Sequence, residues 1–362
     1  MDITGLLKSV VEDDSISDLH LIVNSYPVIR YNGKLKKLNS YGHKFTYEEM
    51  EEIARGLMDE EQWEMFQDKG ELDFSYSVPG FSRFRVNTFY QRGAVSLALR
   101  VIPQDIPTID ELGLPQVLKR LARQRMGLIL CTGPTGSGKS TSLAAMIDLI
   151  NEEKNCHILT LEDPVEYLHH HKNSVVQQRE VGIDTGDFAN GLRAALRQDP
   201  DVILVGEMRD LETISIALEA AETGHLVMAT LHTNTAPATV DRIIDVFPAS
   251  QQDQVRIQLS GTLAGIICQQ LLPRKDGSGR VAALEVLVAT SAVRNIIREG
   301  KSPQLKSQMQ AGSKHGMIVM NNYLVELYEK GLISREMALR RSHNPKQVKK
   351  RLNRGGGARQ LS

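Results

Sequence analysis

Cysteine is scarce in this chain, and the three that occur lie far apart in the sequence. Cys131, Cys156 and Cys268 form no CxxC pair, which excludes the spacing of a zinc ribbon. Isolated cysteines usually serve as small buried apolar residues, and their scarcity is typical of proteins of the reducing cytoplasm. We therefore expect a cytoplasmic protein whose cysteines form no zinc site and serve as buried apolar residues.

Long hydrophobic runs and a net charge are also missing. No stretch approaches the roughly 18 to 20 apolar residues that span a bilayer, and the most apolar region, residues 255–272, is interrupted by an arginine and three glutamines. The N-terminus turns acidic early and lacks the apolar core of a signal peptide. A formal net charge of -1 gives no overall attraction to nucleic acid. The sequence therefore predicts a soluble chain without a nucleic-acid partner.

The charge is unevenly placed along the chain. After Glu336 there is no acidic residue, but eight basic residues follow: Arg340, Arg341, Lys346, Lys349, Lys350, Arg351, Arg354 and Arg359. We expect residues 346–362 to form a basic, disordered tail. Contact of this tail with anionic lipid or with an acidic protein is the alternative.

The length of 362 residues favours two domains. Residues 1–100 mix helical and β-rich patterns, with a helix expected over residues 47–66 and a hairpin turn at Asn32-Gly33. Residues 101–115 hold three prolines and are expected to form an extended linker.

From residue 116 to residue 345, short apolar runs alternate with helical patterns, which indicates an α/β domain with buried parallel strands. Strands are expected over residues 127–131, 157–161, 202–205 and 226–230, and helices over residues 140–151, 188–197 and 211–223. The last third of the chain is expected to be mostly helical.

A glycine-rich loop follows the first of these strands and opens the first helix. Its residues match the pattern GxxxxGK[ST], and the expected nucleotide-binding set is Gly133, Pro134, Thr135, Gly136, Ser137, Gly138, Lys139, Ser140 and Thr141. Such a loop curls backbone N–H groups around phosphate oxygens at a helix N-terminus. Lys139 would neutralise the β- and γ-phosphates and Ser140 would ligate Mg²⁺. The sequence therefore predicts binding of ATP with Mg²⁺, and hydrolysis.

Two carboxylates and a histidine follow the other apolar strands. Glu162 and Glu207 come directly after strands, where ligands of parallel sheets bind. Carboxylates at this place ligate Mg²⁺ or polarise the attacking water, and Glu207 is the expected Mg²⁺ ligand. His232 ends another strand and could sense the γ-phosphate, although a histidine held only by backbone partners is the alternative.

These motifs together resemble a known family. The order GPTGSGKS, LTLEDPVEY, LRQDPDVILVGEMRD and TGHLVMATLHTN is similar to that of the secretion ATPases of the type II/type IV pilus superfamily. SDLHL at residues 17–21 and QQLLP at residues 269–273 resemble those of its pilus-retraction members. A motif associated with retraction, AIRNLIRE, is matched by Ala292, Val293, Arg294, Asn295, Ile296, Ile297, Arg298 and Glu299.

The resemblance implies a PAS-like N-terminal α+β domain followed by a RecA-like P-loop ATPase domain with a helical C-terminal part. It implies a cytoplasmic homohexamer at the inner face of the inner membrane, which associates with the membrane through the pilus machine and its platform protein. The family's arginine-finger positions correspond to Arg85 and Arg100. Within the 292–299 motif we expect Ala292, Val293, Ile296 and Ile297 to pack inward.

The expected function is thus an ATP-hydrolysing hexameric motor that retracts type IV pili. A pilus-assembly or type II secretion ATPase, or an accessory retraction paralogue, is the alternative. Assembly members usually carry a four-cysteine zinc site, which the three scattered cysteines do not supply. A RecA-like nucleic-acid motor or a non-hydrolysing scaffold is disfavoured by the net charge and by the presence of Lys139, Glu162 and Glu207.

Overall fold

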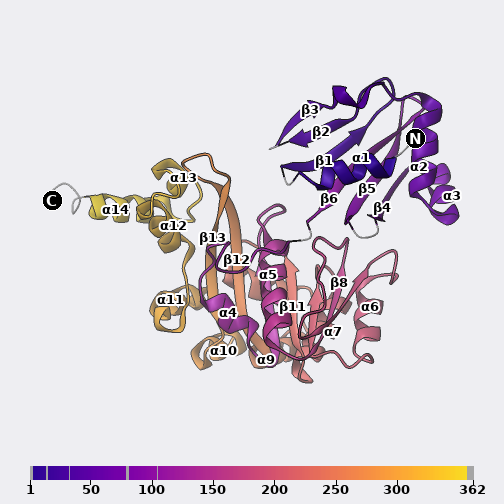
Figure 1. Ribbon diagram of the computed structural model, residues 1–362. Helices are drawn as coiled ribbons and strands as arrows, with labels where there is room; N and C mark the ends of the chain where they lie inside the picture. The colour runs from indigo at the N-terminus through magenta and orange to yellow at the C-terminus, as the bar shows by residue number, and fades with distance from the viewer. Residues whose placement is uncertain (1–2, 14, 32, 79–80, 104, 357–362) are drawn as a thin grey trace. The chain divides into compact units, whose positions relative to one another are not determined.

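The computed structural model describes residues 3–356 with the exception of residues 14, 32, 79–80 and 104 (Figure 1). The chain divides into two compact units. Unit 1 comprises Met1–Asp105 and Glu166–Leu168, and unit 2 comprises Ile106–Val165 and His169–Ser362.

Unit 1 contains a six-stranded sheet in the order β3-β2-β1-β6-β5-β4, in which all neighbouring strands are antiparallel. The strands are β1 (Ile16–Leu21), β2 (Val28–Tyr31), β3 (Lys34–Lys37), β4 (Glu71–Val78), β5 (Ser82–Gln91) and β6 (Ala94–Ile102). The pairing of Tyr31 with Lys34 confirms the hairpin expected at Asn32-Gly33, although Asn32 itself lies outside the described residues. A 3-10 turn occupies Asn39–Tyr41.

Three helices pack on unit 1, and one of the helix boundaries was not expected. They are α1 (Ile3–Val11), α2 (Tyr47–Leu57) and α3 (Glu60–Lys69). The single helix expected over residues 47–66 is wrong, because Met58 is extended and Asp59 begins a new helix by accepting a hydrogen bond from the Gln62 N–H. The polar run of residues 59–62 interrupts the apolar spacing, and the capping pair Asp59 and Gln62 within it was the signal for the second helix.

The sheet of unit 1 has one apolar face and one polar face. Along β5, Phe84 and Val86 are buried in a core with apolar residues of the three helices, while Arg85 and Asn87 point to the opposite face. The polar face therefore remains available for charged side chains.

Unit 2 is built on a seven-stranded sheet in the order β13-β12-β7-β11-β10-β8-β9. All neighbours are parallel except β12 and β13. The strands are β7 (Gly127–Thr132), β8 (His157–Glu162), β9 (Val175–Glu180), β10 (Val202–Val205), β11 (Leu226–Leu231), β12 (Leu263–Pro273) and β13 (Arg280–Val288). The four strands expected from the sequence are confirmed.

The expectation of a mostly helical last third is wrong for β12 and β13. Both strands are buried on both faces over most of their length. A strand of this kind shows no polar–apolar alternation, so periodicity alone does not distinguish it from a buried helix.

Helices cover both faces of this sheet (Figure 1). One core contains apolar side chains of α6 (Phe188–Ala195), α7 (Leu211–Glu222), α8 (Ala236–Asp245), α9 (Gln252–Thr262), α10 (Ser291–Arg298) and α11 (Leu305–Ala311). The other contains those of α4 (Val117–Ala122), α5 (Lys139–Glu153), α12 (Met320–Glu329), α13 (Arg335–Arg340) and α14 (Pro345–Gly356). Short 3-10 turns occupy Ser302–Gln304 and Ser313–His315. Among the described helices, none is both long and apolar enough to cross a bilayer.

The segment expected to be an extended linker is largely ordered within the two units. Strand β6 continues to Ile102, and Ile109 and Leu114 are buried in the core of unit 2. The three prolines stop regular structure but leave the apolar residues between them free to pack.

The expectation of a disordered tail is wrong for residues 346–356, which belong to helix α14. Val348 and Leu352 lie four residues apart on one face of this helix and are buried in the core that α12 and α13 share. Two apolar residues among many basic ones are enough to dock the helix. Residues 357–362 lie outside the described part of the chain.

Candidate functional site

The strand register of unit 2 brings the expected site residues to one edge of the sheet. Thr132, which precedes the glycine-rich loop, pairs with Leu231, which precedes His232. Val205 of β10 pairs with Ala229 on one side and with Leu161 on the other. The loop, His232, Glu207 and Glu162 therefore all follow carboxyl ends of neighbouring parallel strands.

The glycine-rich loop has a backbone that requires glycine. Gly133 has a φ of 145° and Gly138 a φ of 86°, which side-chain-bearing residues rarely adopt. A Cβ on Gly133 would lie 2.3 Å from the Gln269 carbonyl oxygen, and one on Gly138 would lie 2.7 Å from Gln269 Nε2. The buried Ser137 hydroxyl has no hydrogen-bond partner among the described residues. This tight cradle with an unpartnered polar atom fits a phosphate group.

Lys139 lies at the start of α5, inside the loop. Its ammonium donates hydrogen bonds to the carbonyl oxygens of Gly133 and Pro134, at 2.8 and 3.3 Å. Burial lowers the pKa of Lys139, and the nearby Cys131 and Glu207 oppose this shift. Gly138 caps α5 without a side-chain hydrogen bond, so the first-turn N–H groups are not capped by a side chain. The arrangement places positive charge where anionic oxygens bind helix N-termini.

Gln269 on β12 supports the loop from below, a role that the sequence did not predict. Its Nε2 donates to the Ser137 carbonyl at 2.9 Å, and its Oε1 accepts from the Ser142 hydroxyl at 2.8 Å. Only 3% of Gln269 is exposed. A glutamine inside an otherwise apolar run was the available signal, because a buried amide needs partners on both of its ends.

Glu207 is held between two cationic or proton-bearing groups. Its Oε1 lies 3.1 Å from His232 Nε2, and its Oε2 accepts a hydrogen bond from Arg209 at 2.6 Å. Burial alone would raise the pKa of Glu207, but the hydrogen bond from Arg209 and the charges of His232 and Arg209 outweigh it, and the pKa is lowered. Glu207 is therefore a charged carboxylate at neutral pH. His232 has a side-chain partner, so an imidazole held only by backbone groups is not what the structure contains.

Glu162 lies at the same edge but farther from the loop. Its Oε1 accepts hydrogen bonds from the Thr160 hydroxyl at 2.7 Å and from Gln178 Nε2 at 3.1 Å. Because β11 and β10 lie between β7 and β8, the strands that carry the loop and Glu162 are roughly 14 Å apart at the usual inter-strand spacing. Glu162 and Glu207 therefore face different parts of the edge.

Arg85 and Arg100 lie on the polar face of unit 1, directly opposite each other on β5 and β6. Two arginines in this position repel each other, and two aspartates offset the repulsion. Asp18 lies 2.9 Å from Arg100 Nε, and Asp73 lies 3.9 Å from Arg85 Nε. The residues Asp18, His20, Asp73, Arg85, Asn87, Ala98, Leu99 and Arg100 line a cavity of about 300 Å³.

Asp18 is the buried member of this group of charged residues and contacts two arginines. It is 7% exposed, and Arg30 on β2 lies 3.4 Å from its second oxygen. Burial would raise the pKa of Asp18, but hydrogen bonds from Ser17 and Arg100, together with the charges of Arg100 and Arg30, lower it. The role of Asp18 was not predictable from its own strand, because its partners Arg30 and Arg100 lie on β2 and β6.

The 292–299 motif forms most of helix α10, which begins after β13. Val293 and Ile297 are buried and Ile296 packs against the same core. Ala292 is exposed, which contradicts its expected inward position. It precedes the first buried residue by one position, which places it on the outer side of the helix.

The two arginines of the motif have different surroundings. Arg294 donates to the carbonyl oxygens of Ser260 and Gly261 in the last turn of α9, and burial lowers its pKa. Arg298 is exposed. Val288 at the end of β13 pairs with Gly265, and Gly265 pairs with Ile129 near the start of β7. Helix α10 therefore begins near the amino end of β7, whereas the glycine-rich loop follows its carboxyl end.

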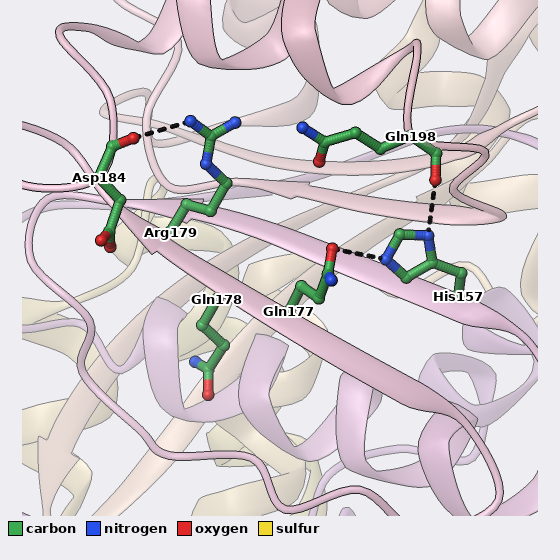
Figure 2. A pocket seen from close by; sticks show the side chains of 6 residues that line it. All are labelled: His157, Gln177, Gln178, Arg179, Asp184 and Gln198. Carbon is green, nitrogen blue, oxygen red and sulfur yellow. Dashed lines mark hydrogen bonds between the residues drawn. The ribbon is translucent and has the colours of Figure 1, made fainter.

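A separate polar groove runs along the edge strand β9. Its cavity of about 700 Å³ is lined by His157, Gln177, Gln178, Arg179, Asp184 and Gln198. Figure 2 shows the His157 ring between Gln177 and the backbone carbonyl of Gln198, with ring-nitrogen contacts of 3.1 Å to each. Arg179 donates to the Asp184 carbonyl at 2.7 Å. These groups hold the loops beside β9 together, and none of them belongs to the glycine-rich loop.

Comparisons with known proteins agree with this site. A family model described as "Type II/IV secretion system protein" matches residues 71–347. The chain belongs to this family. It is 48% identical to the type IV pilus retraction ATPase PilT of Pseudomonas aeruginosa over 95% of its length and 99% of that protein's. It is also 48% identical to a twitching motility protein of Neisseria gonorrhoeae, over 88% of this chain and 84% of that one.

The fold gives the same result. A crystal structure of the pilus retraction motor PilT with bound ADP superposes with a TM-score of 0.90 and 50% identity, covering 97% of this chain and 99% of that chain. The resemblance expected from the motifs is thus confirmed, and the chain is an ATPase of the type II/IV secretion family.

We predict that Gln269→Leu weakens nucleotide binding. Leucine fills the space but leaves the Ser137 carbonyl and the Ser142 hydroxyl buried without their partner, which costs about 1 to 3 kcal/mol. Because the loop conformation that binds phosphate carries this cost, the dissociation constant for a fluorescent ADP analogue should rise by about fivefold or more. Gln270→Leu on the neighbouring, half-exposed position is the matched control, and equal dissociation constants for the two variants would contradict the bracing role of Gln269.

We predict that Asp18→Asn destabilises unit 1 by about 2 kcal/mol at neutral pH, because Arg30 and Arg100 lose their shared anion. The pKa of Asp18 is lowered from 3.8, so the stabilisation is present above about pH 4 and is lost as the pH falls through the folded-state pKa. The effect of the mutation should shrink accordingly in acid. Urea unfolding followed by the fluorescence of Trp63, the single tryptophan, reports on this unit.

The control for this experiment is Asp73→Asn, because the Asp73 side chain is 60% exposed and 3.9 Å from its arginine. It should change the unfolding free energy by less than about 0.5 kcal/mol. A similar loss in both variants would show that the buried charge of Asp18 has no special role.

Proposed function

We propose that this protein is the ATP-driven motor that retracts type IV pili, depolymerising pilin and producing twitching motility. The observation that carries the proposal is the near-complete match to a pilus-retraction ATPase in both sequence and fold. The geometry of the strand edge supports it, since a phosphate cradle, Lys139 and the charged carboxylate of Glu207 lie at neighbouring strand ends there.

We further propose that unit 1 is a PAS-like domain and that unit 2 is a RecA-like ATPase domain. Six copies would form a ring at the cytoplasmic face of the inner membrane, in contact with the platform protein of the pilus machine. The polar face of unit 1 supports this arrangement, because Arg85 and Arg100 lie side by side on it and two guanidinium groups suit the charge of a phosphoryl group.

The residues of this edge, together with Arg85 and Arg100 of unit 1, have separate roles in hydrolysis. The loop from Gly133 to Thr141 binds the phosphates, and Lys139 releases its loop carbonyls to bind their oxygens. Glu162 orients a water whose oxygen attacks the γ-phosphorus as the bond to the leaving ADP oxygen breaks. His232 and Arg209 keep Glu207 charged and in place. Arg85 and Arg100 stabilise the negative charge that spreads over the transferred phosphoryl group.

Mg²⁺ fits the oxygen groups that the site offers. The exposed Ser140 hydroxyl in the first turn of α5 and the Glu207 carboxylate would hold the ion, and hard oxygen ligands of this kind suit it. When bound, the ion neutralises charge on the phosphate oxygens.

The test of the function is a deletion strain complemented with variants. Without the protein we expect many surface pili and no twitching, because assembly continues without retraction. Lys139→Ala should fail to restore twitching and should lose at least about 100-fold in ATP turnover, since the transition state loses its main cation. Lys314→Ala, a change at an exposed lysine, should restore both. Absence of pili from the deletion strain would instead indicate an assembly ATPase.

We also predict that substitutions of the two arginines of α10 have different effects, one on stability and the other on pilus retraction. Arg294→Ala should lower thermal stability, because two carbonyls at the end of α9 lose their donor at a cost of about 1 to 2 kcal/mol. Arg298→Ala should leave ring assembly and ATP turnover within about twofold of wild type, as expected for an exposed position, yet abolish twitching. Oligomer mass and ATP turnover are measured on the variant proteins purified from these strains, and twitching is scored on the strains themselves. Normal twitching of Arg298→Ala would remove the exposed face of α10 from the retraction mechanism.

A further inference from the structure

The C-terminal helix α14 presents lysines on a face that the protein does not cover. Val348 and Leu352 fix the helix to α12 and α13, while Lys346, Lys349 and Lys350 are exposed. Lys346 and Lys350 are four residues apart and lie on one face of the helix. Figure 1 shows α14 beside α12 and α13 at the periphery of the helices of unit 2. The lysines are therefore held on an ordered surface.

Two further cations extend this surface, which we call the basic patch. It comprises Lys346, Lys349 and Lys350 of α14 with the exposed Arg340 and Arg341 at the end of α13. Within the described ranges, none of these five side chains forms an ion pair. The neighbouring arginines are engaged differently: Arg335 donates to Asn353 and Arg351 to Asn322. These two bonds tie α14 to α13 and α12 and leave the lysines uncompensated.

We propose that the basic patch binds directly to the anionic headgroup surface of a membrane. Lysine ammonium groups near such a surface each strengthen binding by roughly fivefold, without the need for a shaped pocket. The chain has no acidic residue after Glu336, so α14 itself carries no negative charge that would oppose this attraction. The proposal goes beyond the motor function, which requires membrane association only through the pilus machine.

The chemistry of the patch favours lipid over macromolecular partners. A protein interface needs apolar or aromatic anchors at its centre, and among the described residues no large hydrophobic side chain after Ile257 is exposed. Single-stranded nucleic acid needs aromatic side chains for stacking, and no aromatic residue follows Tyr328. A patch of cations without such groups matches a diffuse layer of lipid phosphates.

The test uses the full-length protein and co-sedimentation with vesicles. We expect binding to vesicles that contain phosphatidylglycerol, no binding to pure phosphatidylcholine, and loss of binding when salt rises from about 0.1 to about 1 M. The triple variant Lys346→Gln, Lys349→Gln and Lys350→Gln should bind the anionic vesicles on the order of 100-fold more weakly. It keeps Val348 and Leu352, so α14 should remain docked.

A matched control is available in unit 1. Lys34, Lys36 and Lys37 of β3 are all exposed, and their replacement by glutamine removes the same charge. This control should bind the anionic vesicles as the wild type does. No binding of the wild type, equal binding to both lipids, or an equal loss in the two triple variants would overturn the proposal.

ATP turnover of the same three proteins separates this inference from the motor function. We expect equal turnover, because no residue of the basic patch belongs to the nucleotide site. A wild type without turnover would contradict the proposed motor while leaving the vesicle result to decide the basic patch.

Discussion

The alignment of four parallel strand ends is the constraint on which the site depends. Backbone hydrogen bonds keep β7, β11, β10 and β8 in register, so the loop at Gly133, His232, Glu207 and Glu162 leave the sheet at one level. Glu207 and His232 are in contact, but this one contact could not position the loop or Glu162. A shift of register by one residue would move the side chains of a strand to the opposite face of the sheet and away from the residues they pack against. The same apolar packing that stabilises the sheet therefore also sets the geometry of the site.

Buried polar residues on β12 and β13 hold the loops and helices next to the site in place through hydrogen bonds. Gln269 joins β12 to the glycine-rich loop and to α5. Glu285 on β13 is 5% exposed and accepts hydrogen bonds from the N–H groups of Ala236, at 3.0 Å, and Met320, at 3.4 Å. Ala236 begins α8 shortly after His232, and Met320 begins α12. One carboxylate thus fixes both the segment behind His232 and the first of the C-terminal helices.

The meeting of these side chains at one edge of the sheet was largely predictable, because the motifs that carry them are local in the sequence. The spacing of glycines and Lys139 names the phosphate loop, and a carboxylate after an apolar strand marks Glu207. Gln269 and Asp18 could not be found in this way, because their roles arise from strands that meet only in the folded chain. β12 and β13 were missed because strands buried on both faces lack alternation. The basic composition of residues 346–362 predicted disorder. The signal for a docked helix was the four-residue spacing of Val348 and Leu352.

The place of α10 in the fold fits the proposed role of its motif in transmitting force and not in chemistry. It begins at the opposite edge of the sheet from the loop, about 20 Å away for a six-residue strand. Asp210, three residues after Glu207, caps α7, and α7 packs on α9. The last turn of α9 in turn binds Arg294 of α10. The contacts that connect Glu207 to the motif thus run through a helix cap, two helices and the half-buried Arg294. This contiguous path is the route along which the proposed motor would couple the strand ends to the exposed face of α10.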